Sequence, residues 1–259
     1  MMGGHHAISG TAAWLALAGS AQVAGRSTGI GVLDLTATEV LAGAVVTTGA
    51  ALLPDIDHPG ATISRSAGGA SKLLTSAVGS VAGHRGATHT LLAVAAFTLL
   101  AALVARLDWR WQAPVLGEVQ MGAVLVVAVM CAFATRALKV VTGALLPWVI
   151  GLASGVVVAA FAPETTMWLP ASIALGVLVH LAGDFMTTDG IPFPTWPLVV
   201  RPKRTRNASS LWHPDGNVAL PILGNAGSTR EWVLCSAMSL YVGVAIAATV
   251  IDSWSSTAA

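Results

Sequence analysis

Long apolar runs alternate with shorter polar segments along the whole chain. They lie at about 7–24, 39–53, 87–105, 119–135, 143–161, 168–185 and 231–251. Because about 20 apolar residues in a helix cross the ~30 Å hydrocarbon layer of a bilayer, most of these runs are long enough to span a membrane. The pattern predicts an all-α, polytopic membrane protein of about seven apolar helices, in which residues 1–259 form one membrane-embedded domain.

The first two runs are short and rich in glycine, alanine and threonine. Small residues allow close helix packing in lipid, so tilted, partly buried and re-entrant helices are all compatible with these runs. The first run also resembles the apolar core of a signal peptide. Signal peptides begin with a positively charged segment, and none precedes this run, so we expect it to remain in the mature chain.

The composition supports a membrane protein. Hydrophobic residues make up 55% of the chain and charged residues 10%, and the mean hydropathy is +0.75, whereas roughly 25% of an ordinary soluble domain is charged. The formal net charge of +1 gives no general attraction for nucleic acid, so direct nucleic-acid binding is not expected. Cys131 and Cys235 lie inside apolar runs, where small buried residues are favoured over a disulfide.

Basic residues divide unevenly between the two sides if all seven runs cross the membrane. One side includes the loops 54–86 and 186–230. It carries Arg65, Lys72, Arg85, Arg136, Lys139, Arg201, Lys203, Arg204, Arg206 and Arg230. The other side carries only Arg26, Arg106 and Arg110. Because loops rich in lysine and arginine stay in the cytoplasm, the first side is expected to be cytoplasmic.

All seven histidines fall on this side or in the helix turns that end there. In His180-Leu-Ala-Gly-Asp184 the spacing of four residues places an imidazole and a carboxylate on one face of an apolar helix. Ionisable groups inside apolar segments are costly and usually functional. Metal binding or acid–base chemistry is therefore favoured over a simple His–Asp hydrogen bond.

Two further motifs bring similar groups to the same side. Residues 54–59 read Pro-Asp-Ile-Asp-His-Pro, and residues 83–90 read Gly-His-Arg-Gly-Ala-Thr-His-Thr. Carboxylates combined with imidazoles suit zinc, manganese or iron(II). Arg85 and the free N–H groups of a following helix would favour an anion. A solvated turn in the first motif and a structural histidine in the second are the alternatives.

In order along the chain, these motifs resemble the YdjM/DUF457 family of membrane-bound metal-dependent hydrolases. The resemblance begins at His6-x-x-x-Gly10 and continues through Thr187 and Gly190. It implies a bacterial inner-membrane protein with a helical metal-binding core, distantly similar to zinc-dependent phospholipase C. The metal ligands it implies are His6, Asp55, His84, His89, His180 and Asp184. The sequence has no second His-x-x-x-Glu, so one or two ions are expected, preferably zinc, with manganese or iron as alternatives.

The residues around these ligands predict hydrolytic chemistry. A bound divalent metal acidifies water and polarises a phosphoryl oxygen. Asp57, with His58 beside it, would then accept a proton, and Arg85 would neutralise charge on a phosphate. Asp57 or His58 would alternatively orient a metal ligand. Covalent acyl chemistry has no support, because Gly-x-Ser-x-Gly is absent from the sequence.

Three other ionisable residues are left open by the sequence. Ser228-Thr229-Arg230-Glu231 matches a capping box at the start of the last apolar run, so a structural role for Glu231 is preferred over metal ligation. His5 is a further candidate ligand. His213 lies in a loop and has no assigned role.

The loop after Asp184 indicates a lipid-associated substrate. Residues 191–198 are rich in proline and aromatic residues, and a basic cluster follows at 201–206. Basic residues beside a membrane attract anionic lipid at ~1 kcal/mol each, although the same cluster could serve only to set topology. The favoured function is hydrolysis of a phosphoester in a membrane lipid or lipid-linked substrate. An ion or metal transporter and a non-catalytic, metal-stabilised adaptor are the alternatives.

Overall fold

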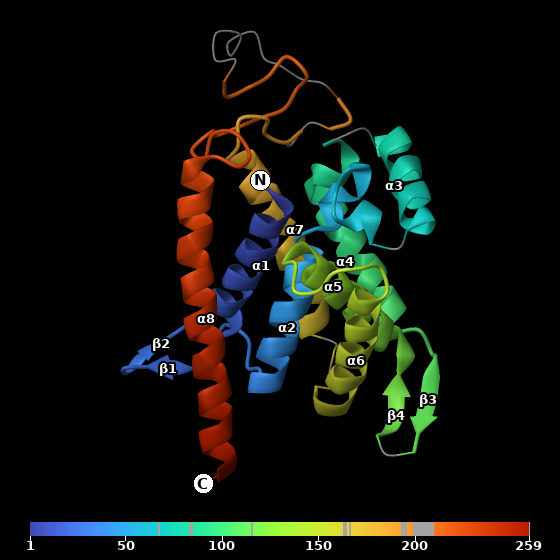
Figure 1. Cartoon of the computed structure of the whole chain (residues 1–259), viewed down its shortest axis with the longest axis vertical. Helices are drawn as coiled ribbons and strands as arrows, with labels where there is room; N and C mark the ends of the chain where they lie inside the picture. The colour runs from blue at the N-terminus through green and yellow to red at the C-terminus, as the bar shows by residue number, and fades with distance from the viewer. Residues whose placement is uncertain are drawn as a thin grey trace.

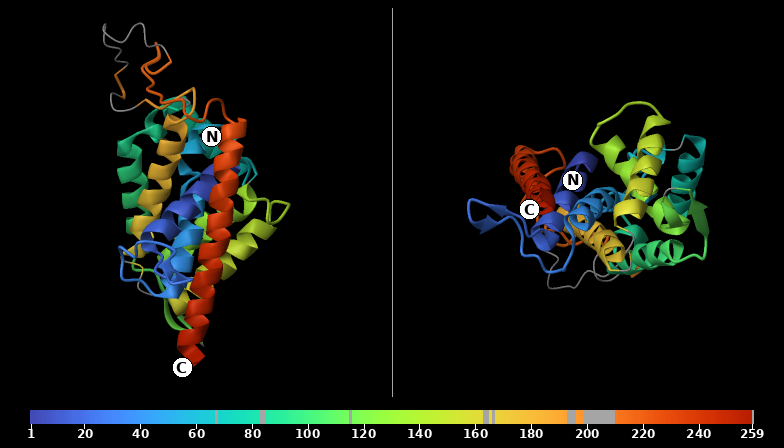
Figure 2. Two further views of the ribbon diagram at one scale, coloured as in Figure 1. Left: turned by 90° about the vertical axis from the view of Figure 1, so that its left-hand side faces the viewer. Right: turned by 90° about the horizontal axis from the view of Figure 1, so that it is seen from below.

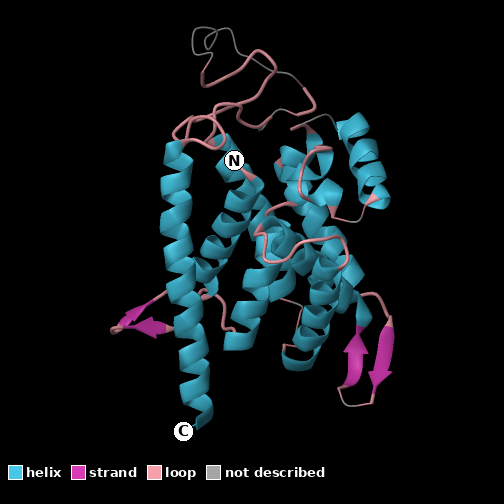
Figure 3. Ribbon diagram, viewed as in Figure 1, coloured by secondary structure: helices cyan, strands magenta, loops and turns pink. Residues whose placement is uncertain are grey.

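The computed structural model describes the chain except for residues 67, 83, 84, 115, 163, 164, 166, 193–195, 199–209 and 259. It is a bundle of helices with two small β-hairpins at its edge (Figure 1, Figure 3). The helices are α1 (Gly3–Ala18), α2 (Ala37–Ala50), α3 (Gly69–Ala82), α4 (Leu91–Ala105), α5 (Met121–Ala137), α6 (Leu146–Phe161), α7 (Trp168–Phe185) and α8 (Thr229–Ala258). Three short 3-10 helices are η1 (Leu53–Asp57), η2 (Ile63–Arg65) and η3 (Ala87–His89).

The predicted helical membrane fold is confirmed, since each of the seven apolar runs contains a helix. Within the described residues, the helical stretches Ala37–Asp57, Trp168–Phe185 and Thr229–Ser255 are long and apolar enough to cross a membrane, and α4, α5 and α6 are shorter apolar helices. Figure 2 shows α8 along the outer edge of the bundle, where it packs on α1. Large apolar side chains of α8, among them Leu240 and Trp254, are exposed, as expected for a surface that faces lipid.

The centre of the bundle is α2, which packs against α1, α5 and α7. Glycines allow these helices to approach closely. A Cβ on Gly10 of α1 would lie 2.9 Å from the Thr47 carbonyl oxygen of α2, and a Cβ on Gly176 of α7 would lie 2.7 Å from the same atom. A Cβ on Gly49 would overlap the backbone of Met130 in α5. Small residues thus set the helix spacing, as is common in membrane bundles.

Two expectations about element boundaries were wrong. The loop 54–86 contains η1, η2 and the helix α3, whose sequence is mostly small residues interrupted by serines and threonine. The first apolar run ends as a helix at Ala18, and the chain then forms the hairpin of β1 (Gln22–Val23) and β2 (Arg26–Ser27). A second hairpin joins β3 (Arg110–Ala113) to β4 (Gly117–Gln120) ahead of α5, and Arg110 pairs across it with Glu118.

The helix directions bring distant segments to one end of the bundle. The N-terminus, the start of α8 and the end of α7 lie at the upper end in Figure 1, while both hairpins and the C-terminus lie at the lower end. The turn η1 contacts η3, α3 and α7 at the upper end. This end therefore gathers the three His/Asp motifs, which lie at 54–59, 83–90 and 180–184 in the sequence.

Candidate metal centre

Each candidate side chain is held where a helix begins or ends. His180 and Asp184 occupy the last two turns of α7 and are buried, and Thr187 donates a hydrogen bond to the Asp184 carbonyl just after the helix. Asp55 lies in η1, which follows α2 with a proline in its first turn. His89 ends η3, directly before Thr90, which caps α4 by accepting from the Ala93 N–H. Because these three apolar segments begin or end at this place, their polar side chains meet without crossing the bundle.

Ligand atoms of His89, His180 and Asp184 lie close together, and Asp55 lies beside His180. The Nε2 atoms of His89 and His180 are 3.2 Å apart. Asp184 Oδ2 lies 3.5 Å from His89 Nε2 and 3.6 Å from His180 Nε2, and Asp55 Oδ1 lies 3.7 Å from His180 Nε2. A tetrahedral ion with ligands at ~2.1 Å keeps those ligands about 3.4 Å from one another. The spacing of His89, His180 and Asp184 therefore fits a single zinc-sized cation.

Hydrogen bonds on the far side of each imidazole direct Nε2 toward this centre. His180 Nδ1 lies 2.7 Å from the Ala51 carbonyl oxygen, which can only accept, so this nitrogen carries the proton. His89 Nδ1 lies 3.3 Å from Asp57 Oδ2. The same oxygen accepts from the Thr88 hydroxyl at 2.6 Å and from the Arg85 backbone N–H at 2.9 Å. Metal-binding histidines are held in this way by carbonyl and carboxylate partners.

The pKa of His89 reflects its position between two carboxylates. Burial alone would lower this pKa, but hydrogen bonds and charge from Asp184 and Asp57 outweigh it and raise the pKa to about 9. At neutral pH the ring is therefore cationic beside those carboxylates. Since metal ligands must be deprotonated, a cation bound there replaces this proton.

His6 extends the cluster from α1. Its ring stacks on His180 with centroids 3.7 Å apart, and its Nε2 lies 3.1 Å from Asp184 Oδ1. Its Nδ1 is buried and has no hydrogen-bond partner among the described residues. His6, His180 and Asp184 form one group able to hold a metal, and Asp55, His89 and His180 form another. The two oxygens of Asp184 face different histidines, and Oδ1 also contacts the N-terminal ammonium of Met1.

Arg85 and Asp55 form the more open side of the centre. The side chain of Asp55 is 23% exposed and that of Arg85 is 14% exposed, whereas the three histidines are almost fully buried. The Arg85 guanidinium lies 3.3 Å from Asp184 Oδ2 and 3.4 Å from Asp189 Oδ2. Its backbone has φ of +52°, a strained conformation for a residue with a side chain. An anion entering past Asp55 would meet this guanidinium beside the ligand set.

Other predicted residues lie elsewhere. His84 falls outside the described residues, as does the basic cluster at 201–206. His58 belongs to neither metal-binding group, and its Nδ1 accepts from the Gly60 N–H within a turn. His213 lies in the loop before α8, where its backbone N–H donates to Asn217.

His5 and Glu231 form a separate buried pair next to the centre. Glu231 lies 2.5 Å from His5 Nδ1 and accepts from the backbone N–H groups of Met2 and Gly227, each at 2.8 Å. The Glu231 N–H donates to Ser228 Oγ, the cap expected from the sequence. Glu231 thus ties the start of α8 to the start of α1, which favours its structural role.

Several partners in this arrangement could not be found by a search for metal ligands. The Ala51 carbonyl is a backbone group, so no residue type marks it. Thr88 lies inside the second motif and Asp189 lies between the motif positions Thr187 and Gly190, but neither residue type marks a partner of a metal ligand. Proximity to a histidine motif was the one available signal for both side chains.

The fold and the centre together define a helical membrane protein with a buried His/Asp cluster at one end of its bundle. The model of the YdjM inner membrane protein family matches residues 1–251, and the chain belongs to this family. This match confirms the family resemblance carried by the sequence motifs and supports a membrane location. No curated protein and no solved structure matches the chain.

Proposed function

We propose that this protein is a membrane-bound, metal-dependent hydrolase of a phosphoester in a lipid or lipid-linked substrate. The observation that carries the proposal is the convergence of two imidazoles and the Asp184 carboxylate at tetrahedral spacing, beside the partly exposed Asp55 and Arg85. Structural metal sites are closed, whereas catalytic sites keep a position for water or substrate. The exposure of Asp55 and Arg85 supports the second kind of site.

We assign His89, His180 and Asp184 as the principal ligands, which leaves the fourth position of a tetrahedral ion open on the side of Asp55. His6 would serve a second ion through Asp184. Nitrogen and oxygen donors without thiolate suit zinc, with manganese or iron(II) as alternatives. A divalent cation held there would lower the pKa of bound water toward ~7 and polarise a phosphoryl oxygen.

The remaining residues would bind and orient. The Arg85 guanidinium would pair with a phosphoryl oxygen and stabilise charge that develops on it. Asp57 is buried and holds His89, so we assign it an orienting role in preference to proton transfer. Asp55 is more accessible to solvent and is the better candidate to accept a proton from the attacking water.

Ion transport is disfavoured by where the buried ionisable groups lie. A permeation path would place such groups along the bundle, because charges inside a membrane need polar surroundings. Among the described residues, the buried histidines and carboxylates are His5, His6, Asp57, His89, His180, Asp184 and Glu231. All of them belong to the segments gathered at the upper end of the bundle in Figure 1.

The test combines elemental analysis with turnover on the same detergent-purified samples. Wild-type protein is expected to carry one or two divalent ions per chain and to hydrolyse phosphodiester or phospholipid substrates. Asp184→Ala should lose both the bound metal and the turnover. Asp34→Ala removes an exposed carboxylate outside the His/Asp motifs and should keep both. Bound metal without turnover of any phosphoester would refute the hydrolase and favour a metal-stabilised adaptor.

A further inference from the structure

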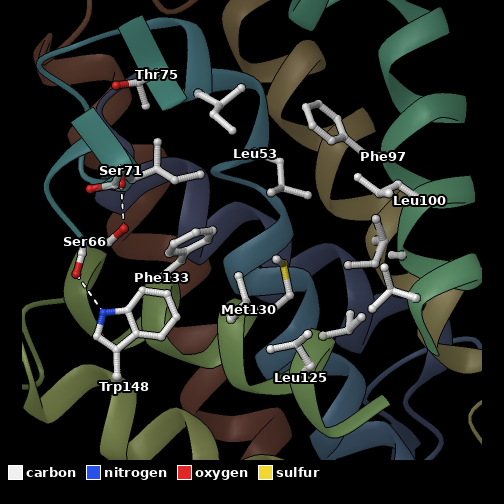
Figure 4. A pocket seen from close by; sticks show the side chains of 17 residues that line it. Leu53, Ser66, Ser71, Thr75, Phe97, Leu100, Leu125, Met130, Phe133 and Trp148 are labelled. Carbon is white, nitrogen blue, oxygen red and sulfur yellow. Dashed lines mark hydrogen bonds between the residues drawn. The ribbon is translucent and has the colours of Figure 1, made fainter. Parts of the chain in front are cut away.

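A large apolar cavity lies beside the candidate metal centre. It has a volume of about 460 Å³ and is bordered by η1, η2, α3, α4, α5, α6 and α7. Figure 4 shows the side chains around it, including Leu53, Phe97, Met130, Phe133 and Trp148. Pockets of ~300–1,000 Å³ are typical for small-molecule ligands, so this one is large enough for a specific occupant.

The few polar side chains in the cavity wall make hydrogen bonds to backbone carbonyls. Ser66 donates to the Ile63 carbonyl at 2.6 Å, Ser71 to the Ser64 carbonyl at 2.8 Å and Thr75 to the Lys72 carbonyl at 3.1 Å. Trp148 Nε1 donates to the Ser66 carbonyl at 2.8 Å. Water enters a cavity when it finds two or more polar partners, and apolar cavities bind apolar molecules. The lining therefore selects hydrocarbon.

The cavity and the metal centre share one wall. Leu53 and Ile56 of η1 line the cavity, while Asp55 of the same short helix faces the His/Asp cluster and Asp57 holds His89. At its edge, Leu100 of α4 is 60% exposed and Leu125 of α5 is 43% exposed. These two helices belong to the apolar bundle, so the cavity borders a surface that faces the lipid chains.

We infer that this cavity holds an acyl chain of the lipid whose phosphoester is cleaved at the metal centre. The inference rests on the proposed function for the identity of the headgroup, but the cavity itself predicts the hydrocarbon chain. A lipid in this position keeps its chain against Leu53 and Ile56 and presents its phosphate beside Asp55 and Arg85. The substrate class is thus a phospholipid taken directly from the bilayer.

Photolabelling tests chain binding without requiring turnover. The full-length protein, loaded with zinc, is placed in nanodiscs that contain a trace of phosphatidic acid with a diazirine on one acyl chain. Wild-type protein should be labelled at cavity residues, above all on η1 and at Phe97. Ala101→Phe, which fills the cavity from α4, should reduce this labelling by at least about fourfold, the affinity equivalent of one buried methylene.

A matched control separates filling of the cavity from a general effect on α4. Ala96→Phe adds the same side chain at an exposed position of α4 outside the cavity and should leave the labelling unchanged. Val129→Phe fills the cavity from α5 and should repeat the effect of Ala101→Phe. Retention of bound zinc shows that each variant is folded, because the ligands come from several segments.

The outcomes separate this inference from the proposed reaction. Cavity labelling that is lost in both filled variants, without turnover of any phospholipid, would support the acyl-chain site and refute the reaction. If folded Ala101→Phe and Val129→Phe keep both phospholipid turnover and labelling, the acyl-chain site is refuted and the proposed reaction stands. Labelling confined to exposed residues of α8 in the wild-type protein would also refute it.

Discussion

Replacing Asp57 by asparagine should weaken metal binding although Asp57 is not assigned as a ligand. One Asp57 oxygen faces His89 Nδ1 at 3.3 Å and accepts from the Thr88 hydroxyl and the Arg85 N–H. Asparagine keeps the shape and one acceptor oxygen but removes the negative charge that makes the imidazole a better donor to a metal. Loss of such an outer partner costs about 10–100-fold in affinity, or ~1.4–2.7 kcal/mol.

The assay is a competitive titration of zinc against a chelator of known affinity, with protein in detergent at fixed pH. Asp57→Asn should raise the dissociation constant by about 10–100-fold, while Asp34→Asn, an exposed carboxylate, should behave as wild type. If the zinc affinity is unchanged but turnover falls by more than about 100-fold, the orienting role is refuted and Asp57 is the residue that accepts the proton. Complete loss of metal, as in Asp184→Ala, would make Asp57 a ligand.

Three further changes test the centre, the packing and the topology. His180→Ala removes the imidazole common to both groups that could hold a metal, so bound metal should fall by a large factor. His213→Ala should retain the bound metal. Equal loss of metal in both variants would mean that the assigned ligands are wrong. Gly49→Ala should cost about 1–3 kcal/mol by overpacking against Met130, measured as a lower melting temperature. Gly243→Ala, which meets open space, is the control, and equal melting temperatures would contradict the packing argument. Reporters fused to the two termini should place the N-terminus in the cytoplasm and the C-terminus in the periplasm, and a periplasmic N-terminus would overturn the assignment.

The fold was predictable where the sequence has strong contrast between apolar and polar residues. Every long apolar run contains a helix, because a bilayer requires backbone hydrogen bonds to be satisfied within the segment. The helix α3 was missed because it consists mainly of small residues, serines and a threonine, a composition also common in loops. The two hairpins are only a few residues long, and charge pairs such as Arg110–Glu118 have no periodic signature.

The site was predictable as a set of motifs but not as a geometry. Asp55, Asp57 and His58 lie within four residues, and nothing in their order says which of them faces the candidate metal centre. The structure ends η1 at Asp57 and gives His58 an extended backbone with φ of −107° and ψ of 115°, which turns the chain away from the helix. The residue at which such a 3-10 helix ends depends on tertiary contacts. Here η1 contacts η3 and α7.

The backbone contacts of Gly10 and Gly176 with Thr47 have a consequence for how the candidate centre would acquire a metal. They join α1, α2 and α7 about one turn from the ligand cluster, and they involve no ligand side chain. The framework of the centre is therefore assembled by helix packing, unlike that of small zinc domains that fold only around their ion. Membrane insertion and metal loading become separable events. On the proposed function, a cell short of metal would accumulate intact, idle protein and would regain activity on resupply without new synthesis.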